Sequence, residues 1–444
     1  MRNHQTKLIK NVRKFFSSFN SMNYSPHNNS IFYLVTTSSF IGSYLLDSLS
    51  KEKSPNFFNN SLIIIKDILY SLNYNNHRIY KSEKNREYNK IIVTWAFEDN
   101  FEKNGSLNDR YFNINSKNLK RTLWFVIYLS NKIPKKIDSN IVLFKPITKK
   151  SINLFTILNN ITKNFFFIFK NFKYYLALIS SYNHFADVFL KQISDFINEN
   201  VQFILMPFEG QPFQNKLINL VKKKYKNIKT IGYIHSPPLA MPSNFIFKSG
   251  CPHKIILNGN DQIYCFTKLL GWKRSSIKLL PSFRFSKSNK KVKNTIFLPL
   301  TIRDAKGVVD RLKILDEKNV INIKKFKIKN HPAALNSKKN AYVIKKIKSL
   351  MHNLDKKKKP NIKENFLIFI GASGAIIEAL ERGSEVIQIC ETPLFDVYSS
   401  KIWSSIKTKK IEKNIYTYKL KKRGNLIKLG NKKNNLKKIF NLKG

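Results

Sequence analysis

Cysteine is scarce in this chain of 444 residues, and its few cysteines form no recognisable pattern. The three cysteines, at positions 251, 265 and 390, have no metal-ligand spacing and are odd in number, which argues against a disulfide framework. A sparse, odd set is typical of a reducing compartment. The sequence therefore predicts a cytoplasmic protein without disulfide bonds.

Acidic residues are also few, with 27 Asp and Glu against 80 Lys and Arg and a net charge of +53. Two interpretations of this charge stay open. Lys, Asn, Ile and Phe all have AT-rich codons, so the charge can be compositional drift on solvated surfaces. It can also attract an anionic membrane face, an acidic glycan or a nucleotide. Nucleic acid is not an expected partner, because the sequence lacks zinc-finger spacing, an RNP-like motif and a compact basic recognition helix.

Long uncharged apolar runs are missing as well. No window of about 20 residues is both uncharged and mainly apolar, so no membrane-spanning helix is predicted. The first residues lead into no apolar core of signal-peptide length, so no signal peptide is expected. Residues 161–179 come nearest to a span, but three lysines interrupt them. A buried helix is the favoured interpretation, and an amphipathic helix at the inner face of the cell membrane is the alternative.

The length predicts two domains or one large one. Residues 286–294 are charged and poor in apolar side chains, as in a linker. Residues 391–405 are expected to cross back toward the first domain. The predicted division is a weakly ordered basic arm (1–30), an N-terminal Rossmann-like domain (31–285), the linker (286–294), a C-terminal Rossmann-like domain (295–406) and a weakly ordered basic tail (407–444).

One unit of strand, turn, helix and strand organises the C-terminal half. Phe366-Leu-Ile-Phe-Ile370 is an unbroken apolar run, as expected of a strand buried on both faces of a parallel sheet. The small residues Gly371-Ala-Ser-Gly374 end it, and a short helix is predicted from Ala375 to Arg382. Gly383 is expected to end this helix in the left-handed conformation, before a second buried strand at residues 386–390.

Small residues at this turn would let a phosphate approach the unpaired N–H groups at the helix start. Ser373 adds a hydroxyl donor beside Gly374, and Glu378 lies just over one turn further on, where it could reach a ribose hydroxyl. An ordinary turn without a ligand is the alternative. The first predicted strand of the same domain leads to Arg303, which could hold a phosphate or a carboxylate or lie on the surface.

A second signal is the strand Phe326-Lys-Ile-Lys-Asn330, which runs into His331-Pro332. Pro332 disfavours helical backbone at the residue before it. His331 is therefore expected to be extended at the carboxyl end of a strand, where open α/β sheets bind ligands. A structural role is the alternative for a lone histidine.

The N-terminal half carries its own candidate residues at two turns. A strand over residues 201–206 ends at Pro207-Phe-Glu209-Gly-Gln211-Pro212, ahead of a predicted helix. The helix dipole would keep Glu209 ionised, so that its carboxylate could take a proton from an acceptor hydroxyl. The next strand, over residues 230–234, delivers His235 to the same edge of the sheet. Helix capping by Glu209 and a structural role for His235 are the alternatives.

These motifs resemble those of known enzymes. Lys329-Asn-His331-Pro332 followed by Gly371-Ala-Ser373-Gly374-Ala-Ile-Ile-Glu378 resembles the His-Pro and serine motifs of bacterial sialyltransferases, polysialyltransferases and capsule Kdo transferases. Met206-Pro-Phe-Glu209-Gly-Gln211-Pro-Phe-Gln214 and Gly232-Tyr-Ile-His235-Ser-Pro-Pro resemble a segment of sialyltransferase-like surface-carbohydrate biosynthesis proteins. The resemblance extends over roughly residues 91–400, but its specific parts are a few short motifs.

The resemblance implies the GT-B fold, in which two Rossmann-like domains face a cleft. It implies a glycosyltransferase of surface polysaccharide biosynthesis (capsule, O-antigen or lipopolysaccharide) that transfers a CMP-linked acidic sugar, such as sialic acid or Kdo, with inversion and without a metal. No cofactor is implied beyond this nucleotide-sugar substrate, and the acceptor would be a glycan or a lipid-linked glycan. The implied site consists of Glu209 and His331 as catalytic residues, Arg303, Pro332, Ser373, Gly374 and Glu378 as donor-binding residues, and His235 and Gln211 as acceptor-binding residues.

Other functions stay open. The turn Ala372-Ser-Gly374 has one serine where those enzymes often have two, so a UDP- or GDP-sugar donor is an alternative. No Asp-x-Asp motif points to a metal-bridged diphosphate. A polyol-phosphate transferase of the teichoic-acid type also resembles this layout, and it would transfer glycerol phosphate from a CDP donor. A non-catalytic glycan-binding protein is the third possibility.

Overall fold

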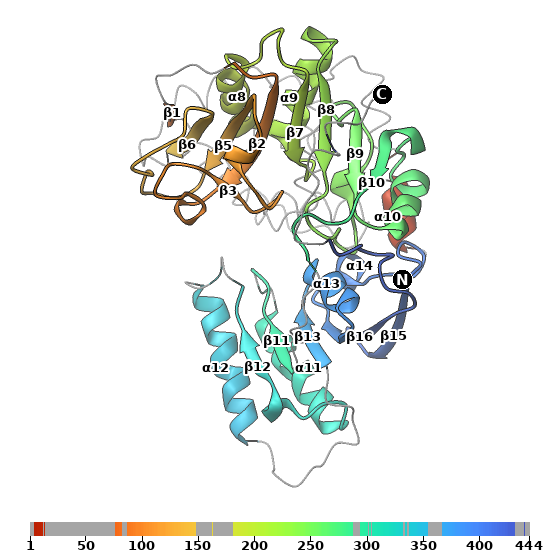
Figure 1. The fold of residues 1–444 in the computed structure, drawn as a ribbon. Coiled ribbons are helices and arrows are strands. Elements are labelled where there is room, and N and C mark those ends of the chain that lie inside the picture. Colours follow the sequence, from red (N-terminus) through yellow and green to blue (C-terminus); the bar gives the residue numbers. More distant parts are fainter. Residues whose placement is uncertain are drawn as a thin grey trace.

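The structure, a computed structural model, describes residues 4–11, 13, 76–81, 87–147, 162, 181–286, 294–300, 302, 304–331, 334, 337–353, 366–430 and 439. Its described strands form two large, mostly parallel sheets, so the predicted α/β class is confirmed. The sheets occupy separate halves of the molecule, one above the other in Figure 1, which is consistent with two Rossmann-like domains. In the sequence, the predicted linker (286–294) falls between β10, which ends at Leu279, and β11, which begins at Thr295, and its residues 287–293 lie outside the described residues.

The N-terminal sheet is parallel, with one antiparallel strand at its edge. Its strand order is β1-β6-β5-β2-β7-β8-β9-β10, and among these described strands the antiparallel pair is β1 with β6. The bounds are Asn76–Lys81 for β1, Lys90–Ala96 for β2, Thr122–Tyr128 for β5, Ile141–Ile147 for β6, Phe203–Pro207 for β7, Lys229–Tyr233 for β8, Lys254–Leu257 for β9 and Ile277–Leu279 for β10. The strands predicted over residues 201–206 and 230–234 are confirmed as β7 and β8.

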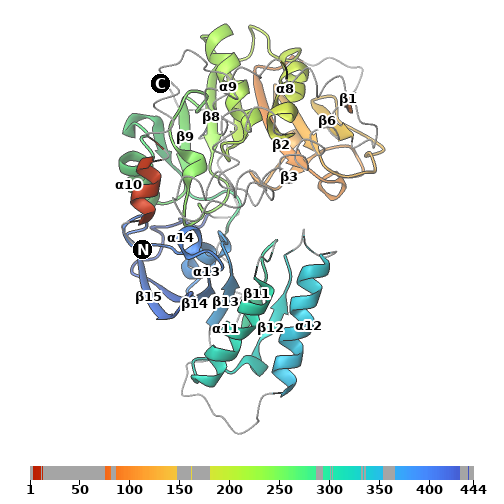
Figure 2. The same ribbon diagram turned by 180° about the vertical axis from the view of Figure 1, so that it is seen from behind.

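Both faces of this sheet are covered, so its central strands are apolar throughout. All seven residues of β5 are buried. On one face, Phe125 packs with helices α8 (Ser181–Ser194) and α9 (Pro212–Lys224), which lie side by side in Figure 2. On the other face, Trp124 packs with Phe112 from the loop between β2 and β5. That loop contains two short helices, Glu98–Asn100 and Ser116–Asn118, and the two-residue strands β3 (Asn108–Asp109) and β4 (Ile114–Asn115).

Shorter helices complete the N-terminal half. They are a 3-10 turn at Ser243–Phe245, α10 (Asn260–Tyr264), a π-helical turn at Cys265–Leu269 that continues α10, and a 3-10 turn at Arg274–Ser276.

The C-terminal sheet has four parallel strands followed by an antiparallel hairpin, in the order β12-β11-β13-β14-β16-β15. Its helices α11 and α12 cover one face, where Leu312 and Ile347 pack on Ile296 and Ile368. The strands are β11 (Thr295–Phe297), β12 (Lys327–Lys329), β13 (Phe366–Ile370), β14 (Glu385–Ile389), β15 (Ile406–Glu412) and β16 (Ile415–Leu420), and the helices are α11 (Ala305–Glu317), a 3-10 turn at Ile323–Lys325, α12 (Lys338–Asn353), α13 (Ala375–Glu381) and α14 (Pro393–Asp396).

The predicted strand–turn–helix–strand unit is confirmed as β13, α13 and β14. Gly383 follows α13 with φ +85°, the left-handed conformation that glycine adopts without steric cost. The apolar face of α13 packs through Ile376 and Leu380 on the sheet face opposite α11 and α12. This unit therefore brings the small-residue turn to the carboxyl edge of the C-terminal sheet.

The basic tail predicted for residues 407–444 is wrong over its first part. β15 and β16 extend the C-terminal sheet beyond residue 406, and the side chains of Tyr416 and Tyr418 are buried in the core. β15 is an edge strand, where lysines are common because they discourage pairing with another chain. Its lysines give the segment the composition of a solvated tail although its backbone is paired.

Residues 421–430 then return to the N-terminal half. Three of their backbone N–H groups donate to the buried carboxylate of Glu381, those of Gly424, Leu426 and Ile427. The amide of Gln262 donates to the carbonyl of Leu426 at 2.8 Å. The chain after β16 is therefore held by backbone groups rather than by its charged side chains.

The basic arm predicted for residues 1–30 is also wrong at its start. Residues 4–11 form a helix beside α10, red in Figure 1, and Leu8 and Ile9 on it are buried. The amide of Gln5 donates to the carbonyls of Leu394 and Val397 at 2.9 and 2.7 Å. The Gln5 amide thus joins the helix to the C-terminal half. Apart from residues 4–11 and 13, the arm lies outside the described residues.

The expected crossing of residues 391–405 toward the first domain is confirmed. The indole N–H of Trp403 donates to the carbonyl of Ala240 at 3.1 Å, and the backbone N–H of Ser405 donates to Asp261 at 3.0 Å. The hydroxyl of Tyr398 lies 3.2 Å from the carbonyl oxygen of Pro238 and 3.1 Å from that of Ser373. Buried hydrogen bonds therefore join the two halves.

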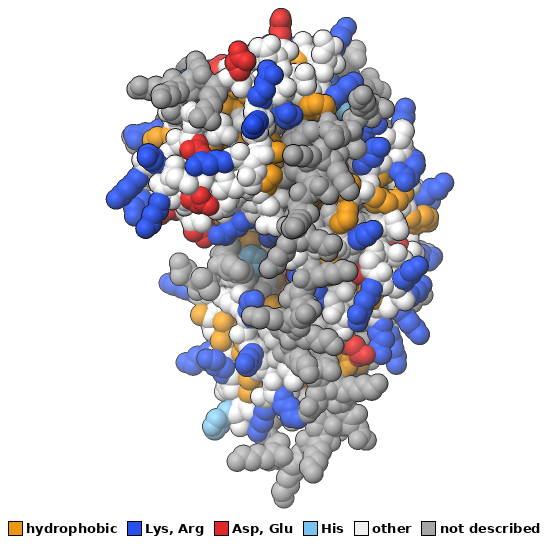
Figure 3. Space-filling model, viewed as in Figure 1, with side chains coloured by type: hydrophobic (Ala, Val, Ile, Leu, Met, Phe, Trp, Pro, Cys, Tyr) orange, Lys and Arg blue, Asp and Glu red, His pale blue; other side chains and the backbone are white. Residues whose placement is uncertain are grey.

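Within the described ranges, no helix is long and apolar enough to cross a membrane. The stretch 161–179, predicted as a buried or amphipathic helix, lies outside the described residues except at Thr162. Lys and Arg side chains are spread over both halves on the face shown in Figure 3, so the charge alone does not mark out a site.

Candidate functional site

A cavity of about 610 Å³ lies between the carboxyl edges of the two sheets. Six of the residues predicted for the site line it together: Glu209 and His235 from the N-terminal half, and His331, Ser373, Gly374 and Glu378 from the C-terminal half. Two others, Arg303 and Pro332, lie outside the described residues. Ligands of open α/β sheets bind outside the carboxyl ends of the strands, so this is where we place the candidate site.

The side chains of Gln214 and Asn244 hold the backbone of the turn after β7, which carries Glu209. The Gln214 side-chain oxygen accepts from the N–H of Glu209 at 3.0 Å and from that of Gln211 at 3.1 Å. Asn244 donates to the carbonyl of Glu209 at 2.7 Å. Gly210 has φ +72°, and a Cβ atom there would lie 2.3 Å from the carbonyl oxygen of Asn244. Only glycine fits this turn, and the turn fixes the position of the carboxylate.

The carboxylate of Glu209 has two side-chain partners. Its Oε1 lies 3.3 Å from Nε2 of His235, and its Oε2 accepts from the amide of Gln211 at 2.6 Å. Gln211 does not line the cavity, so in this structure its amide supports Glu209, and its predicted contact with an acceptor stays a prediction. About a third of the Glu209 side chain (34%) is exposed, against 3% for His235. Of these two side chains, Glu209 is therefore the one more open to a ligand in the cavity.

Burial tends to raise the pKa of Glu209, but its neighbours outweigh burial and lower the pKa below the usual value for a glutamate. The hydrogen bond and charge of His235 act most strongly, followed by the Gln211 amide and the guanidinium of Arg284. At neutral pH the group is a carboxylate with a free oxygen lone pair. It can accept a proton or a hydrogen bond from a hydroxyl group.

His235 is held by aromatic packing. The rings of Tyr111 and His235 pack edge to face with their centroids 4.7 Å apart, and the centroid of the Trp95 ring lies 6.5 Å from that of His235. Burial and the nearby Glu209 carboxylate raise the pKa of Tyr111 to about 12. The buried Nδ1 of His235 makes no hydrogen bond in the described part of the chain. The other ring nitrogen, Nε2, faces Glu209. His235 therefore acts on the Glu209 carboxylate through Nε2.

The C-terminal wall of the cavity carries the groups predicted to bind the donor. His331 lies two residues beyond the end of β12 and is largely exposed, but the protein still removes part of the water around its imidazole, which lowers the pKa of that group. A neutral imidazole at neutral pH can donate an N–H to a phosphate oxygen but adds no charge. The Ser373 hydroxyl oxygen accepts from the N–H of Ala375 at 3.3 Å, which leaves the hydroxyl hydrogen for a ligand.

Glu378 lines the same wall and is paired within its helix. Its Oε1 accepts from the guanidinium of Arg382, from Nε at 3.0 Å and from Nη2 at 2.9 Å. This (i, i+4) pair points the carboxylate along the helix and leaves Oε2 available. The predicted ribose contact requires that oxygen.

Sequence reasoning missed two cations of the cavity, Arg284 and Lys329. Arg284 stands between Phe283 and Phe285 just before the linker, and an arginine among aromatic residues is a pattern that could have singled it out. Lys329 is the last residue of β12 and lies two positions before His331.

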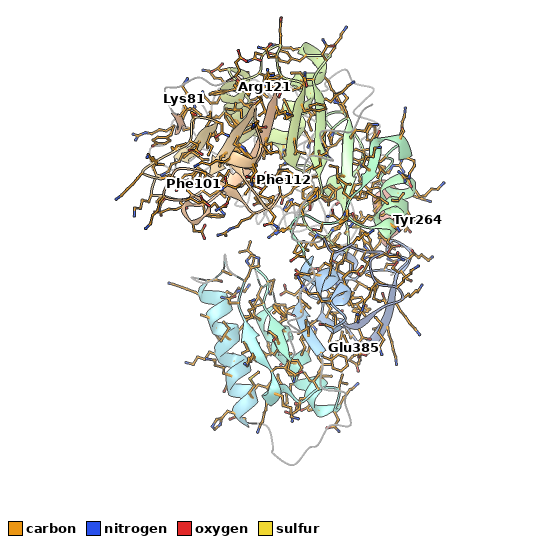
Figure 4. The ribbon with its side chains drawn as sticks, in the orientation of Figure 1. Lys81, Phe101, Phe112, Arg121, Tyr264 and Glu385 are labelled. Atoms are coloured by element: carbon orange, nitrogen blue, oxygen red, sulfur yellow. The ribbon has the colours of Figure 1, made fainter. Side chains whose placement is uncertain are left out.

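A second cavity, of about 810 Å³, lies at the opposite end of the N-terminal sheet. Thr122, which opens β5, and Asn140, just before β6, line it together with Lys81 and Arg121, both labelled in Figure 4. None of the predicted site residues that the structure describes lines this cavity. It lies at the amino ends of parallel strands, so the smaller cavity between the sheets is the stronger candidate.

The described residues include no cluster of three or more His, Cys, Asp or Glu side chains suited to a metal ion. The groups that line the cavity include two carboxylates, two imidazoles, two serine hydroxyls and two cations. The chemistry of the site has to be argued from these groups, because neither a scan against protein-family models nor a search of the curated proteins finds a match for this chain.

Proposed function

We propose that this protein is a glycosyltransferase of GT-B architecture that works in surface polysaccharide biosynthesis. The observation that carries the proposal is the shared cavity. A carboxylate with a lowered pKa, Glu209, faces His331 and Ser373 across it, and each wall comes from a different sheet. This is the arrangement needed to bring an acceptor hydroxyl and a nucleotide-linked sugar together.

In the proposed reaction, the acceptor hydroxyl is bound on the N-terminal side. Glu209 takes its proton while the hydroxyl oxygen attacks the anomeric carbon of the sugar from the face opposite the phosphate. The new glycosidic C–O bond forms as the bond between the anomeric carbon and the phosphate oxygen breaks. The electron pair of that bond leaves with the nucleotide, so the sugar inverts its configuration. General base catalysis of this kind contributes about 10²–10⁴-fold to a rate.

The donor would lie against the C-terminal wall. The hydroxyl of Ser373 and the imidazole of His331 would donate hydrogen bonds to its phosphate, and Glu378 would accept one from its ribose. Arg303 and Pro332 are proposed to belong to the same donor site. A CMP-linked acidic sugar, sialic acid or Kdo, is the proposed donor, and a glycan or lipid-linked glycan is the proposed acceptor. We propose no cofactor beyond this substrate.

The proposed location is the cytoplasm, with contact at an anionic membrane surface as a further possibility for a chain this basic. All three cysteines are buried and free of disulfide bonds, which supports a reducing compartment.

The test is a product assay with the full chain, CMP-sialic acid or CMP-Kdo, and an oligosaccharide acceptor. We expect CMP and an extended glycan from the wild type, and a loss of about 10²–10⁴-fold in turnover for Glu209→Gln, with CMP still bound. Glu199→Gln is the matched control, because it makes the same change on an exposed residue of the same half. Full turnover in Glu209→Gln would remove the proposed base.

Two outcomes would favour other functions. Consumption of CDP-glycerol, with phosphate found in the product, would indicate a polyol-phosphate transferase. If CMP, CDP, UDP and GDP all leave the thermal unfolding midpoint unchanged, a glycan-binding protein becomes the better description, since a ligand at 100 times its Kd adds about 2.7 kcal/mol of stability.

A further inference from the structure

Arg284 is a cation of the cavity whose charge is not neutralised by an ion pair. Its guanidinium lies over the rings of Tyr111 and Phe285, 5.7 and 5.4 Å from their centroids. Its Nη1 donates to the hydroxyl of Ser236 at 3.3 Å. In the ranges that the structure describes, no carboxylate lies within ion-pair distance of it, although Glu209 is near enough for the two charges to interact. Aromatic faces hold a cation in place but leave its charge available.

Lys329 repeats this arrangement on the other wall. Its Nζ lies 5.7 Å from the centroid of the Phe297 ring, which stacks on Phe369 at 4.7 Å with an interplanar angle of 7°. The three residues occupy one row across β12, β11 and β13, because Phe297 is in register with both others. Lys329 likewise has no ion pair among the residues that the structure describes.

The carboxylates of the cavity, by contrast, already have partners. Glu209 is held by His235 and Gln211, and Glu378 is paired with Arg382. The cavity thus has two cations, one from each half of the molecule, whose charges are left for a ligand. A ligand that carries two anionic groups would pair with both of them.

We propose that Arg284 and Lys329 form a two-cation site, in which Lys329 binds the donor phosphate and Arg284 binds the carboxylate of the transferred sugar. This assignment rests on the proposed function. Lys329 shares its wall with His331 and Ser373, whereas Arg284 lies on the side of Glu209. In a 2-keto sugar acid, the carboxylate is attached to the anomeric carbon itself. It must therefore lie on the side of the cavity where the base meets the reacting carbon.

The assignment also resolves a conflict of charge. A sugar carboxylate beside Glu209 would place two negative groups close together, which raises the pKa of a carboxyl group. A guanidinium next to both offsets this repulsion, and its planar fork can bind a carboxylate through two parallel hydrogen bonds. Arg284 is in this sense a specificity-determining residue, because a neutral sugar would leave its charge unpaired.

The experiment is calorimetric titration of the full chain with CMP and with CMP-3-fluorosialic acid, an analogue that resists transfer. We expect Arg284→Gln to bind the analogue about 10–100-fold more weakly, as for the loss of a charge-assisted hydrogen bond, and to bind CMP within twofold of the wild type. Lys329→Gln should weaken both ligands alike. Lys327→Gln is the matched control, because Lys327 lies on the same face of β12 and does not line the cavity.

Two results would overturn the assignment: unchanged affinity of Arg284→Gln for the analogue, or an equal loss for CMP. Failure of the proposed function is separate, since the wild type would then bind neither CMP nor the analogue. Inorganic pyrophosphate, which carries two anionic groups without a nucleoside, then becomes the probe. Weaker pyrophosphate binding in both Arg284→Gln and Lys329→Gln would keep the two-cation site, and unchanged or absent binding would remove it.

Discussion

A Cβ atom added at Gly374 would lie 2.8 Å from the carbonyl oxygen of Pro237, closer than real Cβ contacts. Gly374 belongs to the turn after β13 and Pro237 follows β8, so this contact joins the two walls of the cavity. Gly374 itself has φ −64°, a conformation open to any residue. Space rather than backbone strain requires glycine here.

Gly374→Ala should therefore push the two walls apart. We expect the free energy of unfolding to fall by about 1–3 kcal/mol, the usual cost of forcing an extra methyl group into a packed contact. We also expect weaker binding of CMP, because the small-residue turn is displaced from the opposite wall. Urea unfolding and calorimetric titration with CMP measure the two effects.

Gly424→Ala is the matched control for this change. Gly424 has φ +79° but nothing within 4 Å of its added Cβ, so its substitution introduces strain without a clash. It should lower stability by about 1 kcal/mol and leave CMP binding unchanged. If Gly374→Ala binds CMP as well as Gly424→Ala does, the contact between the walls has no role in forming the site.

His235→Ala should shift the pH dependence of turnover. The contact of His235 with Glu209 is the strongest of those that lower the pKa of the carboxyl group, so its loss raises that pKa. Only the ionised carboxylate can take a proton, and activity disappears as the pH falls through the pKa of Glu209. The acid limb of kcat/KM is therefore expected at higher pH in His235→Ala than in the wild type.

His331→Ala serves as the comparison for that profile. His331 is expected to act on the departing phosphate and is not among the groups that lower the pKa of Glu209, so its loss should reduce kcat but leave the acid limb where it is in the wild type. An acid limb that does not move in His235→Ala would show that Glu209 does not set it.

The central strands of the two sheets could be predicted because they are unbroken apolar runs, as expected of strands covered on both faces. Phe366-Leu-Ile-Phe-Ile370 is the clearest case, and the structure has β13 over these five residues. The hairpin of β15 and β16 could not be predicted in this way. β15 lies at the sheet edge and is rich in lysine, so its sequence resembles a solvated tail. The buried residues Tyr416 and Tyr418, which show that the segment belongs to the core, lie on the neighbouring strand β16.

The candidate site was partly accessible from the sequence for a simple geometric reason. Glu209 and His235 follow β7 and β8, and parallel neighbours end at the same edge, so their proximity could be anticipated. The cations could not be placed, since Arg284 depends on the rings of Tyr111 and Phe285 and Lys329 on that of Phe297. Such contacts arise from tertiary packing, which periodicity does not encode. The roles of all these residues stay predictions.

Asp109 should make stability fall with rising pH in a defined window. It is buried, and burial raises its pKa to about 6 from an ordinary value of 3.8, although Thr94, Phe112 and Tyr111 donate hydrogen bonds to it. Between these two values the folded protein binds more protons than the unfolded chain, so stability decreases as the pH rises. Asp109→Asn removes this dependence.

The measured quantity is the unfolding free energy of the wild type minus that of Asp109→Asn. It should fall by on the order of 3 kcal/mol between pH 4 and pH 7, at 1.36 kcal/mol per pH unit between the two pKa values. Urea unfolding at several pH values gives this difference. A difference that stays constant or rises would mean that Asp109 is ionised throughout. Since Asp109 orients the turn that carries Tyr111 to His235, the same series reports on the support of the site.

Glu381 should hold the returning segment 421–430 on the rest of the fold. Its carboxylate accepts from the N–H groups of Gly424 at 2.5 Å, Leu426 at 2.8 Å and Ile427 at 3.0 Å, and it is 5% exposed. Glu381→Ala leaves three backbone donors without this acceptor, so we expect the free energy of unfolding to fall by on the order of 3 kcal/mol and limited proteolysis within 421–430 to be faster.

Glu385→Ala is the comparison, because the 3.2 Å ion pair of Glu385 with Lys419 is exposed on both sides and contributes less than about 1 kcal/mol. Equal stability and equal cleavage of the two variants would mean that the segment is held by its apolar contacts, through Leu426 and Ile427, and that the carboxylate only follows it.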